Sequence, residues 1–291
     1  MRSGILLVDK PAGMTSHDVT HAIARRLGAK AGHTGTLDKF ATGLLLVCVG
    51  SATRASEYLT SLSKRYLAAA VLGTSTDTYD TSGREVFSSP AVPEREAVDK
   101  AAARFVGPIS QVPPPYSAKK IRGRRASDYA RQGVDVEVKP ANVTIHELKI
   151  VDYSYPDLRL MVSCSSGTYI RSLVKDMGDV LGCGAVTKEL RRSAIGEFQV
   201  ERAVTFDSLM GEDPAETQKR VVLTHDALYF FPAVSLDDEQ ARQFEHGRGV
   251  KKTGGTGMLR VFKEGGEFIG VGRMKGDLLA PEKVFALRRN A

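Results

Sequence analysis

The segment GHTGTLDKFATGLLL (32–46) is the part of this chain whose residues best suit a catalytic site, and it holds a single carboxylate, Asp38. Its neighbours are mainly apolar, and a carboxylate in such surroundings can act as a nucleophile or a general base. Two glycines before it predict a sharply turned backbone, because glycine adopts positive φ at little cost. Taken alone, the pattern is more typical of an aspartate that serves a turn, with His33 as an ordinary polar loop residue.

Other residues with metal-binding chemistry are less well arranged. His17 and His21 are four residues apart on a predicted helix, but no glutamate-bearing zinc motif or third ligand accompanies them. Asp77 and Asp80 lie in the turn-rich stretch TSTDTYDTSG, which lacks the alternating ligands and final glutamate of a calcium loop. The sequence therefore favours solvated histidines and a polar turn.

Nucleotide-binding and disulfide patterns are also missing from the sequence. The pair Gly255 and Gly257 precedes a strand and has no third glycine, and no G-K-[ST] phosphate loop occurs. Three cysteines without C-x-x-C spacing argue against a disulfide framework and a structural zinc site. We expect a reducing, cytoplasmic environment.

Composition allows a large folded chain with a polyanionic partner. The 291 residues include 42% hydrophobic ones, enough for one large and one small domain, and the formal net charge is +7. Positive charge favours nucleic acid, because lysine and arginine release counterions from phosphates. The chain begins directly with a strand-like segment, and no apolar run approaches the ~20 residues of a membrane helix. We expect an unprocessed soluble protein.

Periodicity places these residues on a mixed set of elements. Strands are predicted at 5–8, 64–73, 134–155 and 157–165, and a helix capped by Ser16 ends at Gly28. A second amphipathic helix follows Gly167 and carries Arg171 in its first turn. A cation there opposes the helix dipole, so this arginine needs a compensating anion. The segment 211–219 is predicted to be a polar connection.

Five segments resemble the TruB family of tRNA pseudouridine synthases in the family's order. The central motif of that family is GHTGTLDPxATGLL, which segment 32–46 closely matches. The other four are GILLVDKPAGMTSHDV (4–19), KRYLAAAVLGTSTDTYDTSG (64–83), VPPPYSAKKIRGRRASDYARQG (112–133) and CSSGTYIRSLVKDMGDVLGCGA (164–185). The resemblance thus covers essentially the whole chain. One departure is Lys39, where the family usually has proline.

The resemblance implies an α+β pseudouridine synthase fold with a central, largely antiparallel sheet flanked by helices. Residues 1–230 would form the catalytic domain, with a basic RNA-binding insertion at about 113–140. Residues 231–291 resemble the small, mostly β PUA RNA-binding module. The insertion gathers lysines and arginines beside two tyrosines, which is typical of a segment that grips RNA as much as of a solvated charge run.

The resemblance also assigns roles in the site. Asp38 is the expected catalytic residue, and Arg171 is its expected ionic partner. Tyr66 is expected to stack on a flipped uracil, although a tyrosine at a strand start more often serves packing. The remaining expected substrate-binding residues are His33, Asp80, Tyr169 and Leu190. No metal ligand is expected.

The implied reaction is isomerisation of uridine 55 in the tRNA T-loop to pseudouridine, by base flipping and without a cofactor. Asp38 could attack the uracil ring, attack the ribose anomeric carbon, or remove a ribose proton to open a glycal path, and the sequence leaves all three open. The expected partner is the T-stem-loop of tRNA, with no membrane and no obligate protein partner, and we expect a monomer. The alternative is an RNA chaperone or binding module with lost or subordinate catalysis.

Overall fold

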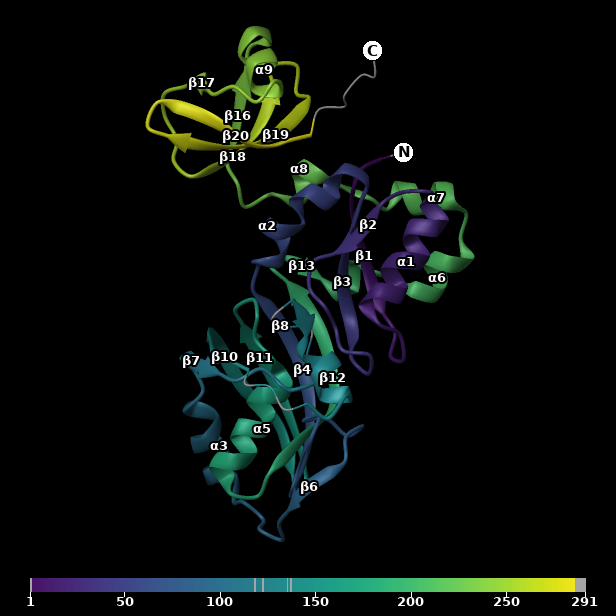
Figure 1. Ribbon diagram of the computed structural model, residues 1–291, viewed down its shortest axis with the longest axis vertical. Coiled ribbons are helices and arrows are strands. Elements are labelled where there is room, and N and C mark those ends of the chain that lie inside the picture. The colour runs from purple at the N-terminus through teal and green to yellow at the C-terminus, as the bar shows by residue number, and fades with distance from the viewer. Residues whose placement is uncertain (1, 118, 122, 135, 137, 286–291) are drawn as a thin grey trace.

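An eleven-stranded sheet forms the centre of the larger part of the molecule (Figure 1). The computed structural model describes residues 2–117, 119–121, 123–134, 136 and 138–285. Along the sheet the strand order is β14-β1-β3-β12-β4-β11-β10-β7, with β2, β13 and β15 attached at its sides. The strands are β1 (Gly4–Lys10), β2 (Ala31–His33), β3 (Thr42–Val49), β4 (Lys64–Leu72), β7 (Gly107–Gln111), β10 (Ala141–Ser154), β11 (Asp157–Cys164), β12 (Ala185–Ile195), β13 (Phe198–Gln199), β14 (Val204–Thr205) and β15 (Val222–Leu223).

Burial of the strands follows the sequence pattern. β3 is apolar along its length and buried on both faces, whereas β4 alternates buried and exposed residues because only one of its faces is covered. Most neighbouring strands are antiparallel, and short parallel pairings join β1 to β14 and β3 to β12. The predicted α+β class with a largely antiparallel central sheet is confirmed.

Helices cover this sheet in separate groups. Helices α3 (Arg95–Ala103) and α5 (Ile170–Leu181) lie over the β4, β10 and β11 region, with Val98, Leu173 and Met177 in a shared core. Helices α1 (Ser16–Leu27) and α6 (Phe206–Gly211) pack on β1 and β3. Around the same strands lie η1 (Gly50–Ala55), α2 (Ser56–Thr60), η2 (Val200–Arg202), α7 (Pro214–Lys219) and α8 (Thr224–Ala227).

A five-stranded sheet with its own core lies at one end of the long axis (Figure 1). Its order is β16-β18-β19-β20-β17, and helix α9 (Asp238–Glu245) packs against it through Phe244. Its strands are β16 (Ala233–Leu236), β17 (Val250–Lys251), β18 (Met258–Lys263), β19 (Phe268–Lys275) and β20 (Leu278–Val284). Val271 and Phe285 also join a core cluster with Ile5 of β1, so the two parts share apolar packing.

Smaller elements lie outside both sheets. The strands β5 (Thr74–Thr76) and β6 (Glu85–Ser88) form a hairpin. The basic insertion contains the short pair β8 (Lys120–Ile121) and β9 (Arg124–Arg125), followed by helix α4 (Ala126–Arg131). Among the described residues, no helix is both long enough and apolar enough to cross a membrane.

Three element boundaries differ from the sequence-based expectation. The cap of α1 is Thr15, which forms a capping box with Asp18, so Ser16 is the first helical residue. The strand expected from residue 134 begins at Ala141. The expected connection at 211–219 contains α7, whose start is fixed by the N-cap Asp213 and by Pro214 in the first turn.

We predict that Gly43→Ala lowers the free energy of unfolding by more than ~2 kcal/mol, because a side chain there meets both backbone strain and a clash. Gly43 has a φ of 102°, and a Cβ atom would lie 2.3 Å from the carbonyl oxygen of Arg192 on the neighbouring strand. Urea denaturation measures the change.

Gly211→Ala is the matched control, because a Cβ atom at Gly211 meets nothing within 4 Å and its φ is not positive. Equal stability of the two variants would contradict the close approach of β3 to β12.

Candidate active site

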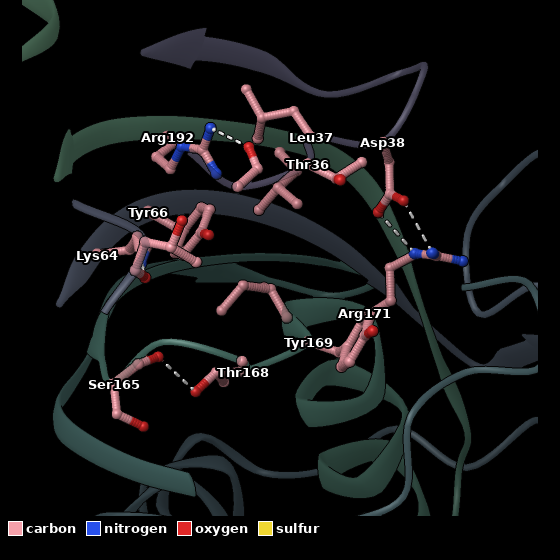
Figure 2. Close-up of a pocket in the computed structure, with 15 residues that line it drawn as sticks. Thr36, Leu37, Asp38, Lys64, Tyr66, Ser165, Thr168, Tyr169, Arg171 and Arg192 are labelled. Atoms are coloured by element: carbon pink, nitrogen blue, oxygen red, sulfur yellow. Dashed lines mark hydrogen bonds and ion pairs between the residues drawn. The ribbon is translucent and has the colours of Figure 1, made fainter. Parts of the chain in front are cut away.

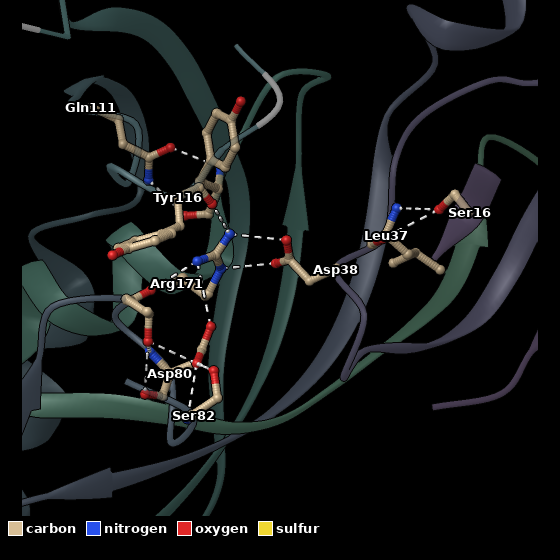
Figure 3. Close-up of polar contacts among 10 residues, drawn as sticks. Ser16, Leu37, Asp38, Asp80, Ser82, Gln111, Tyr116 and Arg171 are labelled. Atoms are coloured by element: carbon tan, nitrogen blue, oxygen red, sulfur yellow. Dashed lines mark hydrogen bonds and ion pairs between the residues drawn. The ribbon is translucent and has the colours of Figure 1, made fainter. Parts of the chain in front are cut away.

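The guanidinium of Arg171 is the centre of a buried polar cluster in which all five of its N–H donors are used (Figure 3). Nε and Nη2 donate to the two carboxylate oxygens of Asp38 at 2.8 and 2.9 Å. Nη1 donates to the carbonyl oxygen of Thr78 at 2.8 Å and to Oδ2 of Asp80 at 3.4 Å. Nη2 also donates to the carbonyl oxygen of Tyr116 at 2.9 Å. Lysine, with three donors on one nitrogen, could not make this set.

Helix α5 places Arg171 in this position. Its N-cap is Tyr169, whose backbone N–H donates to Gln111 Oε1 at 2.8 Å while Gln111 Nε2 donates to the Tyr169 carbonyl oxygen at 3.0 Å. The side chain of Arg171 is only 4% exposed. A buried cation beside the positive end of a helix is costly without anions, so Asp38 and Asp80 provide the compensating charge.

The loop that carries Asp38 is fixed from three sides. Ser16 Oγ accepts from the N–H of Leu37 at 2.8 Å and donates to its carbonyl oxygen at 3.2 Å. The N–H of Gly13 donates to the Lys39 carbonyl oxygen at 2.8 Å. Arg192 Nη2 donates to the carbonyl oxygen of Gly35 at 3.1 Å. The backbone on both sides of Asp38 is therefore held, and its side chain remains 33% exposed.

Asp80 is fixed by its own turn. Its Oδ1 accepts from the N–H of Ser82 at 3.0 Å, from the Ser82 hydroxyl at 2.5 Å and from the Thr78 hydroxyl at 2.8 Å. The remaining oxygen, Oδ2, faces Arg171. The carboxylate thus belongs to the structural support of the arginine, and it does not line the cavity described next.

A cavity of about 240 Å³ opens beside Asp38 (Figure 2). Asp38 and Arg171 lie at one side of it, and Tyr66 and Lys64 of β4 lie at the other. Apolar and small side chains form much of the remainder, and the lining residues are Gly35, Thr36, Leu37, Thr60, Ser165, Gly167, Thr168, Tyr169, Ile170, Leu190 and Arg192. A cavity of this size suits one small planar group.

Burial changes the titration of several groups near the cavity. It raises the pKa of the Tyr66 phenol and that of Tyr169, so both stay neutral in the physiological range. Burial, together with the nearby charge of Arg192, lowers the pKa of Lys64 to about 8. Lys10, the last residue of β1, donates to the carbonyl oxygens of Pro11 and Met14. Burial lowers its pKa to about 8 as well.

The structure brings together most of the residues singled out from the sequence. Asp38, Tyr66, Tyr169, Arg171 and Leu190 line the cavity, and Asp80 supports it from behind through Arg171. His33 is different, because it lies on β2, paired with Val47 of β3, and does not line the cavity.

Four polar or charged residues that are prominent in the site were not singled out from the sequence. They are Lys64, Arg192, Tyr116 and Gln111. Lys64 could have been noticed in the sequence. It lies on the same face of β4 as Tyr66 and the buried alanines, which is an unusual place for a charged residue. Tyr116 acts through its backbone carbonyl, for which residue type gives no signal. Gln111 acts through its side-chain amide on the backbone of Tyr169, which is 58 residues away, so no local pattern indicates this contact.

Among the described residues, no group of three or more histidine, cysteine or acidic side chains could hold a metal ion. His17 and His21 stack on each other with ring centroids 6.2 Å apart. The arrangement instead offers one carboxylate, charge-paired but accessible, at the side of an aromatic-lined cavity. Such a group can form or break a bond, or move a proton, on a planar ligand.

Three family models together match most of the chain. The family model described as the TruB family pseudouridylate synthase N-terminal domain matches residues 24–170, and two TruB C-terminal models match residues 171–228 and 232–285. The chain belongs to the TruB family. Its TruB relatives include the tRNA pseudouridine synthase B of Azoarcus sp., which is 43% identical over 97% of this chain and 95% of the relative. The tRNA pseudouridine synthase B of Dechloromonas aromatica is 42% identical over 98% of this chain and 96% of the relative. That of Haemophilus influenzae is 40% identical over 97% of this chain and 94% of the relative.

Solved structures share the TruB fold. A chain from a Cbf5-Nop10-Gar1 complex superposes with a TM-score of 0.75 at 26% identity, over 98% of this chain and 85% of that one. A chain from an archaeal box H/ACA sRNP Nop10-Cbf5 complex gives 0.74 at 25% identity, over 98% and 87%. The predicted pseudouridine synthase fold is thereby confirmed.

We predict that Lys39→Pro keeps or raises the thermal midpoint, because proline restricts the unfolded chain and removes no used donor. Lys39 is exposed, and within the described residues its N–H has no hydrogen-bond partner. Differential scanning calorimetry measures the effect.

Ala41→Pro is the contrasting variant, since the Ala41 N–H donates to the Asp38 carbonyl oxygen at 3.1 Å. It should lower the midpoint clearly. A loss of stability in Lys39→Pro as well would show that Asp38 does not adopt the extended backbone that a following proline requires.

Proposed function

We propose that this protein converts uridine 55 in the T-loop of tRNA to pseudouridine. The observation that carries the proposal is the Asp38 carboxylate, paired with Arg171 at the side of a cavity for one planar group, in a chain of the TruB family. Relatives at 40–43% identity over nearly the full chain are named tRNA pseudouridine synthase B, which supports tRNA as the substrate. The formal charge of +7 fits a polyanionic partner.

The reaction needs the base to leave its stack and enter the cavity. In this proposal the flipped uracil stacks on Tyr66, while Tyr169 and Leu190 close the cavity around it. His33 lies on β2 and does not line the cavity, and its proposed role is to fill space beside the extruded base. No cofactor takes part, because the isomerisation transfers no electrons and adds no group.

Asp38 is the proposed catalytic residue, as a nucleophile or a base. Each of the three paths requires an ionised carboxylate, whether it attacks the uracil ring, attacks the ribose anomeric carbon or removes a ribose proton. Arg171 pairs with both carboxylate oxygens and so fixes the orientation of the carboxylate beside the cavity. Asp80 and the carbonyl groups of Thr78 and Tyr116 in turn hold the arginine in place.

RNA binding is proposed to involve two further regions. The basic insertion at about 113–140 borders the site directly through Tyr116. The five-stranded sheet that begins at β16 supports a division into a catalytic domain, residues 1–230, and a PUA domain, residues 231–291. We propose that the protein acts as a monomer in the cytoplasm, without an obligate protein partner.

The direct test is incubation with an unmodified tRNA transcript, followed by carbodiimide-dependent primer extension to locate pseudouridine. The expected result is a single stop that reports position 55, absent when that uridine is replaced by cytidine. Tight binding without conversion would overturn the proposal and favour the RNA-binding alternative.

We predict that Asp38→Asn abolishes conversion while the Kd for the stem-loop changes by only several-fold, because the amide keeps the shape but can neither attack nor accept a proton. Asp99→Asn is the control, since Asp99 is an exposed carboxylate paired with Arg95 on α3. If Asp38→Asn converts uridine at a rate similar to that of Asp99→Asn, Asp38 is not the catalytic residue.

We predict that Arg171→Lys lowers the single-turnover rate nearly as much as loss of the acid. Lysine cannot pair with both oxygens of Asp38 and also reach Thr78, Asp80 and Tyr116. Arg95→Lys, in an exposed ion pair, is the control for the same chemical change. If Arg171→Lys retains near-normal rates, the two-pronged pairing is dispensable.

A further inference from the structure

Lys64 is a buried cation of the cavity for which no role has yet been given. It is 6% exposed, and its ammonium donates to the carbonyl oxygens of Thr60 and Leu62, each at 2.5 Å. An ammonium has three N–H donors, so these two bonds leave one. Among the carboxylates of the described residues, none forms an ion pair with Lys64. A buried charge with a remaining donor is costly unless a ligand completes it.

Arg171 and Arg192, the other cations of the cavity, also bind protein groups. Arg171 uses its five donors on Asp38, Asp80 and two carbonyl groups. Arg192 is 1% exposed and donates to the carbonyl oxygens of Leu44 and Gly35, at 2.8 and 3.1 Å, which hold its guanidinium in place. Lys64 keeps one donor that a ligand in the cavity can use.

The position of Lys64 relates it to a base stacked on Tyr66. The two residues are two apart on β4, so their side chains leave the same face of the strand. Figure 2 shows Lys64 beside Tyr66, across the cavity from Asp38. A ring that stacks on Tyr66 with its ribose toward Asp38 would present its outer edge to Lys64.

That edge of uracil carries carbonyl oxygens, which accept hydrogen bonds. When the bond from ribose C1′ to N1 breaks, N1 keeps the electron pair, and conjugation spreads the negative charge onto O2 and O4. The ring then turns about the axis through N3 and C6, which exchanges N1 with C5 and O2 with O4. C5 bonds to C1′, the proton on C5 is lost and N1 gains one, so the composition is unchanged.

We propose that Lys64 is a further catalytic residue, which donates a hydrogen bond to a uracil carbonyl oxygen and stabilises the negative charge that develops on the ring. This proposal rests on the proposed function. Because turning the ring exchanges O2 and O4, the same donor meets an oxygen before and after the turn. If Asp38 attacks the ring instead, the charge develops on a carbonyl oxygen too, so the role does not depend on the path.

The same contact selects the base. Cytosine has an amino group in place of O4, and one of its two orientations would set that amino group against the ammonium, donor against donor. Only a ring with acceptors at both positions satisfies Lys64 throughout. Burial lowers the pKa of Lys64 to about 8, so the ammonium form still predominates at neutral pH.

The test measures single-turnover rates of the full chain on stem-loops that carry uridine, 2-thiouridine or 4-thiouridine at the target position. Sulfur accepts hydrogen bonds poorly, so the wild-type protein should be at least 10-fold slower on one thio-substituted RNA. Lys64→Met should lower the rate on uridine by roughly 10²- to 10³-fold, as for loss of one donor to a developing oxyanion. In that variant the difference in rate between uridine and the thio-substituted RNA (the thio effect) should largely disappear, because the group that senses the sulfur is absent.

Lys100→Met is the control, because Lys100 is an exposed lysine paired with Glu96 on α3, and it should keep the wild-type rates and thio effect. The proposal is overturned if the ratio of the rates on uridine and thio-substituted RNA is the same in wild type and Lys64→Met. It is also overturned if Lys64→Met binds RNA more weakly and with a changed salt dependence while the wild type shows no rate difference between the RNAs, because that result indicates a phosphate contact. If Lys64→Met does not fold, the wild-type comparison decides, and equal rates on all three RNAs overturn the proposal. Failure of the wild type to modify uridine would instead refute the proposed function.

Discussion

The pairing of Arg171 with Asp38 is the interaction on which the rest of the site depends. One guanidinium joins a loop after β2, a turn after β5, the start of the basic insertion and the first turn of α5. Each of these segments would leave a buried charge or carbonyl group unpaired if the arginine moved. The cluster is thus stable only when all four segments are in place, which ties the geometry of the carboxylate to the fold as a whole.

The apolar framework makes that arrangement possible. β3 buries a continuous apolar run, β4 buries alternate residues, and α5 packs its apolar face on the core that includes those of β4. The Asp38 loop is attached to this framework through hydrogen bonds from Ser16, Gly13 and Arg192, which belong to three different elements or loops. A short, glycine-containing loop therefore gains a defined shape from its surroundings, and not from its own propensity.

Much of this organisation could be predicted from the sequence, because alternating burial in β4, the apolar run of β3 and the helical period of α5 are local patterns. The need of Arg171 for an anion also followed from its place in the first turn of a helix. The contact of Tyr116 did not, because it is made by a backbone carbonyl, which carries no residue-specific signal. The contact of Gln111 did not either, because its side-chain amide binds the backbone of Tyr169, 58 residues away in the chain. The strand expected at 134–155 begins at Ala141, and the β-branched residues before Ala141 had extended the strand-like pattern in the sequence. The start of α7 was missed although Asp213 and Pro214 form a standard helix start.

The hydrogen bond from Arg171 to the Tyr116 carbonyl oxygen has a consequence for how RNA can reach the cavity. Residue 116 lies at the base of the basic insertion, so any displacement of that segment which carries Tyr116 away removes one acceptor from a guanidinium that is 4% exposed. A hydrogen bond to a charged group contributes roughly 1.5–3 kcal/mol. An incoming polynucleotide must then either leave this carbonyl in place or replace it with an acceptor of its own. The insertion and the Asp38 carboxylate are thereby in thermodynamic linkage, since both accept hydrogen bonds from one side chain.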